Sequence, residues 1–187
     1  MRIFIKNMVC DRCKIMVRAE FEKLGLTPLS VVLGEVEIGD TQLDVAQLES
    51  LTSSLYKLGF ELLTDRKQQL VNQIKSLLIG HIHDQEERLN TNLSSFLSHQ
   101  LGLSYASLST LFSEMENGTI EQFVIRQKIE KAKELLTYNE NSISEIAYRL
   151  DYSSIAHFSS QFKKITGQTP SFFKKSLVLK RQTLDRV

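Results

Sequence analysis

The 187-residue sequence predicts an α+β domain followed by an all-α domain. Three observations lead to this prediction. Over residues 1–63, short apolar runs with period-two alternation are interspersed with two stretches of helical periodicity. From residue 65 to about residue 175, the apolar residues follow helical spacing. Finally, the segment 96–104 recurs in degenerate form at 145–153.

The α+β domain is predicted at residues 1–64, with its elements in the order βαββαβ. Its first helix places Val17, Phe21 and Leu24 on one face, and Gly25 is typical of a helix C-terminus. This order is a split βαβ arrangement, which is a ferredoxin-like topology. The expected strands are 2–6, 29–33, 35–38 and 60–63, and the expected helices are 13–24 and 45–58.

A connector helix and loop are predicted at residues 65–87. Asp65 can cap a helix whose apolar stripe runs from Leu70 to Ile82. The polar stretch from His83 to Asn92 is expected to end this helix. The all-α domain then covers residues 88–176, and a basic tail covers residues 177–187.

The repeated segment predicts two helix-turn-helix units. In each copy a helix carries a small residue, Ser98 or Ala147, where a second helix can cross closely. The turn that follows carries a residue that tolerates positive φ, Gly102 or Asp151. A polar, serine-rich helix comes next, at 104–115 in the first unit and at 154–165 in the second.

Two more helices complete the all-α domain. A long one, marked by apolar residues from Phe123 to Leu136, is expected to hold the two units in fixed register. The pair Thr169-Pro170 provides a cap followed by proline at the first helical position, which predicts a final helix ending near Lys175.

Composition and charge narrow the class of protein. Hydrophobic residues make up 42% and charged residues 24%, as in ordinary globular proteins, and no apolar run is long enough to cross a membrane. The N-terminus has no apolar core typical of a secretory signal, so we expect a cytoplasmic protein. The net charge is +1, but residues 147–187 carry eight basic and two acidic residues. This basic end favours binding to a polyanion.

Three segments resemble the C-terminal signature of AraC-type transcriptional regulators. They are 143–153 (ISEIAYRLDYS), 158–164 (FSSQFKK) and 167–170 (GQTP), and the upstream segment 130–136 (EKAKELL) resembles the linker helix of that family. The resemblance implies a seven-helix DNA-binding domain that places both recognition helices in successive major grooves of double-stranded DNA. RNA polymerase is a further partner to consider, and the chain would act as a monomer or a homodimer.

The resemblance also implies which residues face the DNA. The groove-facing residues would be Ala106, Ser107, Ser109 and Thr110 in the first unit and Ile155, Ala156, Ser159 and Ser160 in the second. None is Arg, Asn or Gln, the side chains that read bases most strongly, so we expect modest direct readout and a larger part for DNA shape. Phosphate contacts are expected from Lys163, Lys164, Lys174 and Lys175 and from the helix N-termini near Ser104 and Ser153-Ser154.

The segment Met8-Val9-Cys10-Asp11-Arg12-Cys13 resembles a heavy-metal-associated (HMA-like) module, although Asn7 and Val9 replace the usual Gly and Thr. Cys10 and Cys13 would then bind a soft metal ion. Two thiolates without a nearby histidine are typical of Cu(I) or Hg(II), whereas structural Zn(II) prefers four ligands. A redox pair is an alternative. His81 and His83 are two apart on a helix and do not share a face, so we do not expect them to be ligands.

The sequence thus predicts a DNA-binding regulator of AraC type that senses a soft metal ion through Cys10 and Cys13. Two alternatives stay open. In one, the N-terminal domain is a non-metal interaction or dimerisation module, and in the other the chain is a redox or metal-carrier protein. No nucleophile–base pair, paired carboxylate motif or phosphate-binding glycine loop is found, so an enzyme is not expected.

Overall fold

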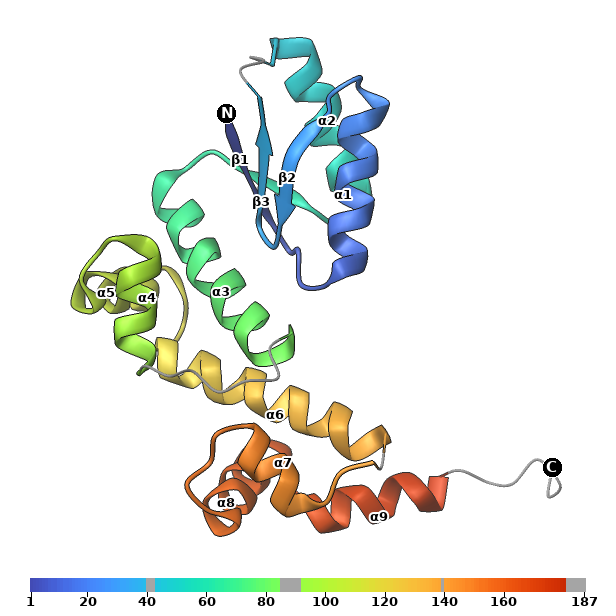
Figure 1. The fold of residues 1–187 in the computed structure, drawn as a ribbon, viewed down its shortest axis with the longest axis vertical. Coiled ribbons are helices and arrows are strands. Elements are labelled where there is room, and N and C mark those ends of the chain that lie inside the picture. Colours follow the sequence, from blue (N-terminus) through green and yellow to red (C-terminus); the bar gives the residue numbers. More distant parts are fainter. Residues whose placement is uncertain (40–42, 85–91, 139, 181–187) are drawn as a thin grey trace, which may run out of the picture. The chain divides into compact units, whose positions relative to one another are not determined.

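The computed structural model describes residues 1–39, 43–84, 92–138 and 140–180 of the chain (Figure 1). These residues group into two compact bodies. The N-terminal body comprises residues 1–81 and 91–117, and the C-terminal body comprises residues 82–90 and 118–187. The grouping joins the first helix-turn-helix unit with the α+β segment. The domain boundaries drawn from the sequence remain a prediction.

A four-stranded antiparallel sheet is central to the N-terminal body, with strand order β2-β3-β1-β4. Strand β1 pairs with both β3 and β4, so that Ile3 lies opposite Val36 and Ile5 lies opposite Leu62. Alternation along the strands buries Ile3, Ile5 and Val36 on one face of the sheet. The strands are β1 (Arg2–Lys6), β2 (Pro28–Val32), β3 (Glu35–Ile38) and β4 (Glu61–Leu63), close to the predicted ranges.

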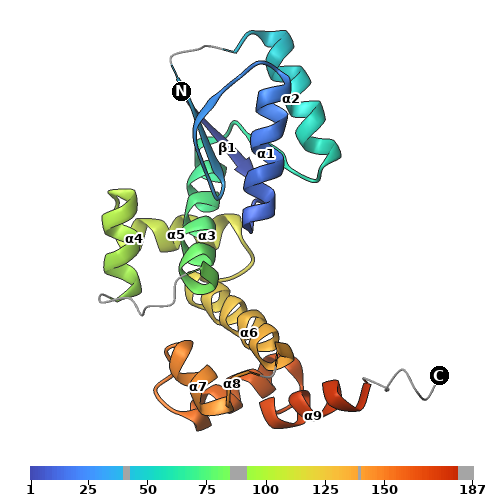
Figure 2. The same cartoon turned by 45° about the vertical axis from the view of Figure 1, so that its right-hand side comes forward.

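Helices α1 (Asp11–Lys23) and α2 (Val45–Lys57) lie side by side over the sheet (Figures 1 and 2). Phe21 of α1 and Leu55 of α2 are fully buried in the core that they share with the sheet. The Asp44 side chain and Gln47 form a capping box that begins α2. The predicted element order βαββαβ is therefore confirmed.

Helix α3 (Arg66–Asp84) is the predicted connector, and its side chains form hydrogen bonds with the sheet and its β2–β3 turn. The buried Asn72 side chain donates to the carbonyl oxygens of Ile5 (3.2 Å) and Gly34 (3.4 Å). Gly34 has a positive φ of 77°, and a Cβ atom added there would collide with the side chains of Ser76 and Asn72. The connector is thus part of the N-terminal body over most of its length. Most of the polar stretch expected to end it, residues 85–91, lies outside the described residues.

Six helices follow α3 among the described residues. The repeat predicted the four that form the two helix-turn-helix units, and the apolar spacing after Phe123 and the Thr169-Pro170 pair predicted the other two. The N-terminal body holds α4 (Leu93–Leu101) and α5 (Tyr105–Met115), and the C-terminal body holds α6 (Ile120–Tyr138), α7 (Ile143–Arg149), α8 (Ile155–Thr166) and α9 (Pro170–Lys180). Ile129, Ala132 and Leu136 of α6 share a buried core with α7 and α8. No helix among the described residues is long and apolar enough to cross a membrane.

One predicted boundary was wrong. Helix α9 continues to Lys180, whereas the sequence placed its end near Lys175. Residues 176–180 contain neither glycine nor proline, so no residue there interrupts the helix. Part of the predicted tail at 177–187 is therefore helical, and residues 181–187 lie outside the described part of the chain.

Candidate nucleic-acid interface

The second helix-turn-helix unit consists of α7 and α8 joined by a tight turn. Asp151 adopts a positive φ of 58° in this turn, as expected for the turn residue. Phe158 and Phe162, four residues apart on α8, are fully buried and contact each other at 5.7 Å between ring centroids. Burial of this face leaves the opposite face exposed, with Ile155 exposed to 48%. Exposed residues on that side also include Ala156, Ser160, Lys163 and Lys164, whereas Ser159 is half-buried.

Two serines predicted to contact DNA already make local hydrogen bonds. Ser154 caps α8, because its hydroxyl oxygen accepts a hydrogen bond from the backbone N–H of His157 at 3.1 Å. The Ser153 hydroxyl lies 3.3 Å from Nδ1 of the same histidine. Both serines remain exposed at the start of the helix, where backbone N–H groups can bind a phosphate.

The first helix-turn-helix unit, α4 and α5, repeats this design. Gly102 ends α4 with a positive φ of 65°, and Ser104 caps α5 by accepting from the N–H of Ser107 at 3.2 Å. Leu108 and Phe112 are buried on the inner face of α5. Of the predicted groove-facing residues, Ala106, Ser107 and Thr110 are exposed, and Ser109 is half-buried.

The four predicted phosphate-binding lysines differ in their surroundings. Lys163, Lys164 and Lys175 are exposed. Lys174 is half-buried and donates to the carbonyl oxygen of Asn141 at 3.1 Å, so it also stabilises the loop before α7. Its ammonium group is therefore less available to a phosphate than the sequence suggested.

Cys10 and Cys13 are brought together at the start of α1. Cys10 is the residue before the helix and is exposed, Cys13 lies in the first turn, and their sulfur atoms are 3.4 Å apart. Hydrogen bonds from the backbone N–H and the thiol of Cys13, and the nearby Arg12, lower the pKa of the Cys10 thiol. A lowered pKa favours the thiolate, which is the form that binds metals and attacks disulfides.

Other groups near the cysteines are engaged elsewhere. Asp11 pairs with Lys14 at 2.7 Å, which removes its carboxylate as a simple oxygen ligand. Among the described residues, no group of three or more His, Cys, Asp or Glu side chains could hold a metal ion. Two thiolates are a ligand set typical of soft ions such as Cu(I) or Hg(II), whereas structural Zn(II) sites have four ligands.

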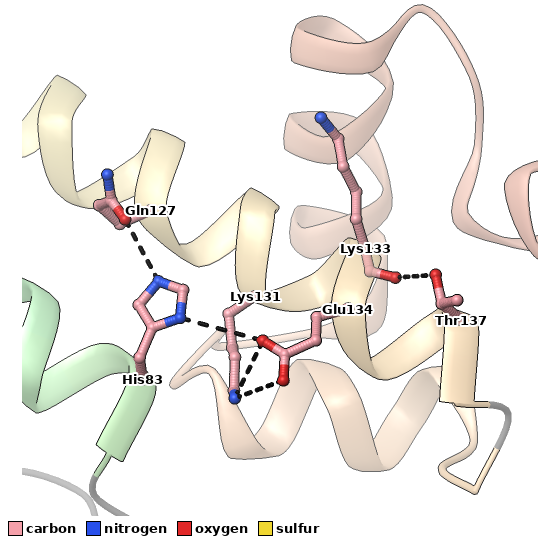
Figure 3. A network of polar contacts seen from close by, with 6 residues as sticks. All are labelled: His83, Gln127, Lys131, Lys133, Glu134 and Thr137. Atoms are coloured by element: carbon pink, nitrogen blue, oxygen red, sulfur yellow. Dashed lines mark hydrogen bonds and ion pairs between the residues drawn. The ribbon is translucent and has the colours of Figure 1, made fainter. Parts of the chain in front are cut away.

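His81 and His83 make structural contacts. The His81 ring lies 5.8 Å from the ring of Phe96. Figure 3 shows His83 between Gln127 and Glu134 of α6, with Nε2 3.2 Å from the Gln127 amide oxygen and Nδ1 4.0 Å from the Glu134 carboxylate. Lys131 donates to the same carboxylate at 3.1 Å. The two imidazoles thus contact different partners, as their spacing predicted.

Comparison with known proteins identifies the C-terminal segment. The helix-turn-helix domain family matches residues 97–176. The chain is 30% identical over 134 residues to the raffinose operon transcriptional regulatory protein RafR of Pediococcus pentosaceus, across 68% of this chain and 47% of RafR. The matched segment, residues 97–176, contains the second helix-turn-helix unit and most of the first. The chain thus spans less than half the length of RafR.

Two solved structures resemble the part of the chain that contains the matched segment. The C-terminal domain of AraT, a response regulator from Geobacillus stearothermophilus, is 27% identical, with 60% of this chain and 88% of that chain covered and a TM-score of 0.51. An AraC-type transcriptional regulator from Chromobacterium violaceum is 24% identical, with coverage of 59% and 93% and a TM-score of 0.51. The second likeness supports the fold alone.

The matched segment also contains a polar contact between Tyr152 and Gln161 that the sequence did not suggest. The buried Tyr152 hydroxyl donates to the side-chain oxygen of Gln161 at 2.7 Å, across the turn that joins α7 to α8. Burial raises the pKa of Tyr152 to about 12, so the phenol keeps its proton at neutral pH. Sequence periodicity does not indicate this contact, because Tyr152 precedes α8 and Gln161 lies within it, nine residues further on.

Proposed function

We propose that this chain is a DNA-binding transcriptional regulator of AraC type, acting in the cytoplasm on double-stranded DNA. RafR is named as a transcriptional regulatory protein and AraT as a response regulator, which supports this proposal. The main support for the proposal is that the matched segment contains two helices of the same design, α5 and α8. Each begins with a serine cap and buries one of its faces. Each exposes a row of small side chains on the side away from its buried residues.

In this proposal α5 and α8 enter the major groove. Serine and threonine hydroxyls can donate to or accept from base edges, and the methyl groups of Ala106, Ala156 and Thr110 can contact thymine. Side chains this short allow close approach but supply few bidentate contacts. Specificity then depends in part on DNA shape and deformability. Because one chain carries both helices, a monomer can bind an asymmetric site, and a homodimer or a complex with RNA polymerase would add contacts.

Phosphate contacts would come mainly from the second unit. Lys163 and Lys164 are exposed in the last turn of α8. The corresponding end of α5 carries the acidic residues Glu114 and Glu116 instead. About five phosphate contacts in total correspond to a slope of log affinity against log salt of about −4 to −5. The second unit is therefore proposed to supply most of the affinity.

Selection from a random duplex library tests this function. We expect the full chain to enrich one asymmetric sequence and to bind it at least ~10³-fold tighter than random DNA at physiological salt. Replacing Ser160 by Asp should abolish that preference, because a carboxylate would face the DNA backbone and bases. The matched change Ser53→Asp, on the exposed side of α2, should leave binding unchanged. Failure to enrich any sequence would contradict the proposal.

We further propose that the βαββαβ part is a ferredoxin-like, HMA-like module that senses a soft metal ion through Cys10 and Cys13. Two observations support it: the strand order β2-β3-β1-β4, and the 3.4 Å approach of the two sulfur atoms at a helix start. Two metal–sulfur bonds of about 2.3 Å each span up to ~4.6 Å, so a small opening of the pair admits one ion. The ion would neutralise two thiolates at the first turn of α1.

An anaerobic titration with Cu(I), Hg(II) and Zn(II) separates this proposal from its alternatives. One equivalent of Cu(I) or Hg(II) should bind tightly, and the Cys10→Ser/Cys13→Ser variant should not bind. The affinity of the full chain for its selected DNA should then change with metal only in the wild type. Equal metal binding by the variant would leave a redox pair or an interaction and dimerisation module as the explanation of this body.

The pH dependence of alkylation tests the reactivity of Cys10 independently of metals. Because the Cys10 pKa is lowered, its iodoacetamide reaction should reach half its maximal rate below pH ~8.5, the usual value for a cysteine. In Cys13→Ala the midpoint should rise, since the thiol donor is lost. A midpoint that is the same in both proteins would contradict the hydrogen-bonded pair.

A further inference from the structure

The N-terminal body contains a cavity of about 160 Å³ between the sheet, helix α3 and the end of helix α5. Strands β1 and β4 contribute Lys6 and Leu63, and helix α3 contributes the largest share of the wall. The end of recognition helix α5 closes the cavity with Met115 and Glu116. A molecule bound here would therefore touch the sheet, the connector and the first DNA-reading unit at once.

The wall combines hydrogen-bond donors with an apolar patch. Lys6 and Lys75 bring ammonium groups, and Gln68 and Asn72 bring amides. Leu63, Val71 and Met115 supply hydrocarbon surface. A cavity of about 150 Å³ holds a molecule the size of benzene, so a ligand of roughly six to ten non-hydrogen atoms fits. Ammonium donors beside a small apolar wall match a carboxylate joined to a short carbon chain.

The two lysines are paired in a way that a ligand can change. Lys75 contacts the Glu116 carboxylate at 2.7 Å, and Lys6 contacts Glu61 at 3.0 Å. The Lys75 side chain is 26% exposed, so its charge is partly desolvated and interacts more strongly than a surface charge. A second carboxylate in the cavity would compete with Glu116 for this ammonium group. Glu116 follows the last residue of α5, so its release alters the end of that helix.

We propose that this cavity binds a compact organic acid, whose carboxylate takes Lys75 from Glu116 and so loosens the end of α5. The binding step needs no DNA, and it is separate from the cysteine pair. The proposal therefore goes beyond the regulator function, and binding can be tested even if that function fails. Only the consequence for DNA affinity rests on it.

Succinate is a suitable probe, because it offers two carboxylates to the two lysines of the wall and two methylenes to its apolar residues. The full chain is labelled at its methionine methyl groups and titrated without DNA. The Met115 methyl resonance should shift saturably, whereas the Met16 resonance should not, since Met16 is exposed on α1 and lies outside the cavity wall. Inorganic phosphate should bind at least several-fold more weakly, because it lacks the hydrocarbon part.

Three variants should change succinate affinity in three different ways. Lys75→Met should weaken succinate binding about tenfold, the typical value of a lost charge-assisted hydrogen bond. Glu116→Gln should instead tighten it several-fold, because the competing carboxylate is gone. Lys67→Met, exposed on the same helix and outside the cavity wall, should leave it unchanged.

The opposite signs separate a binding site from general loss of structure, since an unfolded variant cannot bind more tightly. The absence of a saturable Met115 shift would overturn the proposal. Weaker binding in Glu116→Gln would overturn the competition for Lys75, and phosphate binding as tight as succinate binding would overturn the assignment to an organic acid.

Discussion

The two helix-turn-helix units share a local design but have different surroundings. In each unit a residue of positive φ, Gly102 or Asp151, turns the chain into the second helix. A serine caps that helix, and two apolar residues four apart bury one face of it. Because these features are short-range, they recur even though the two copies differ at most positions.

The surroundings of the two units differ in attachment and in charge. The first unit groups with the sheet and α3, and Lys75 of α3 pairs with Glu116 at the end of α5. The second groups with α6 and α9, and the last turn of α8 carries Lys163 and Lys164. The same local pattern thus occurs in one unit that pairs with α3 and in another whose own second helix carries positive charge. The motif is the same in both units, whereas its attachment depends on the neighbouring elements and its charge depends on the residues at the end of each second helix.

The shared design predicts the largest effects, and predicts them equally in both units. Phe112→Ala and Phe162→Ala should each lower the free energy of unfolding by about 3–5 kcal/mol, because each removes a buried ring and leaves a cavity. Urea denaturation followed by circular dichroism measures the loss. Phe172→Ala is the control, since that ring is 59% exposed and its loss should cost little. If only one of the two variants lost this much free energy of unfolding, the two buried rings would not be equivalent in their contribution to stability.

The difference in charge predicts the next largest effect, on DNA affinity. Lys163→Ala/Lys164→Ala should weaken binding to all sequences and reduce the magnitude of the salt slope by about 2, one unit for each lost phosphate contact. Fluorescence anisotropy across a range of salt concentrations measures both. Lys57→Ala, in the last turn of α2, removes a positive charge from a helix that is not expected to contact DNA. If it changed the slope by as much as one lysine of the pair, net charge alone would explain the result.

The two turns can be compared directly by exchanging their residues. Gly102→Ala should cost about 1–2 kcal/mol, because a residue with a Cβ is strained at φ 65°. Gly102→Asp copies the residue of the second turn and should cost less, since Asp visits this conformation more readily. An added Cβ at Gly102 meets no atom within 4 Å, so the cost is one of backbone conformation. Gly39→Ala, which has equal space and no positive φ, should be close to neutral.

Most of the fold followed from short-range signals in the sequence. Period-two alternation located β3 from Glu35 to Ile38, and the Thr169-Pro170 pair located the start of α9. The end of α9 was missed because no residue after Lys175 stops a helix, and a helix without a breaker ends where its packing ends. How closely α3 packs on the sheet was also hidden, since Asn72 meets Ile5 and Gly34 only after the chain has folded.

The candidate site was less predictable than the fold. Phe158 and Phe162 are four residues apart, so helical spacing alone places these two buried rings on one face of α8. It could not show that Lys174 bonds to the Asn141 carbonyl, or that Tyr152 bonds to Gln161, since both contacts join positions that share no helix. The cavity beside Lys75 could not be predicted for the same reason, since its wall joins Lys6, residues 63–75 and residues 115–116, three segments that are distant in sequence.

The smallest predicted effect compares the first helices of the two units through their caps. In α7, hydrogen bonds from the Ser142 hydroxyl and the Ser142 backbone N–H lower the pKa of Glu145. A carboxylate whose pKa is lower when folded stabilises the protein above its unfolded pKa of about 4.3, and this contribution is lost as the pH falls through the folded value. Glu145→Gln should therefore have a lower free energy of unfolding than the wild type at pH 7. This difference between the two proteins should disappear below about pH 4.

In α4 the cap is Asn92, whose amide accepts from the N–H of Ser95 and does not titrate. Asn92→Ala should lower stability by about 1 kcal/mol, and by the same amount at pH 7 and below pH 4. Urea denaturation of both variants and of the wild type across this pH range measures the two differences in free energy of unfolding. A gap for Glu145→Gln that stays constant with pH would show that the carboxylate of the second unit acts only through its shape, as the amide of the first unit does.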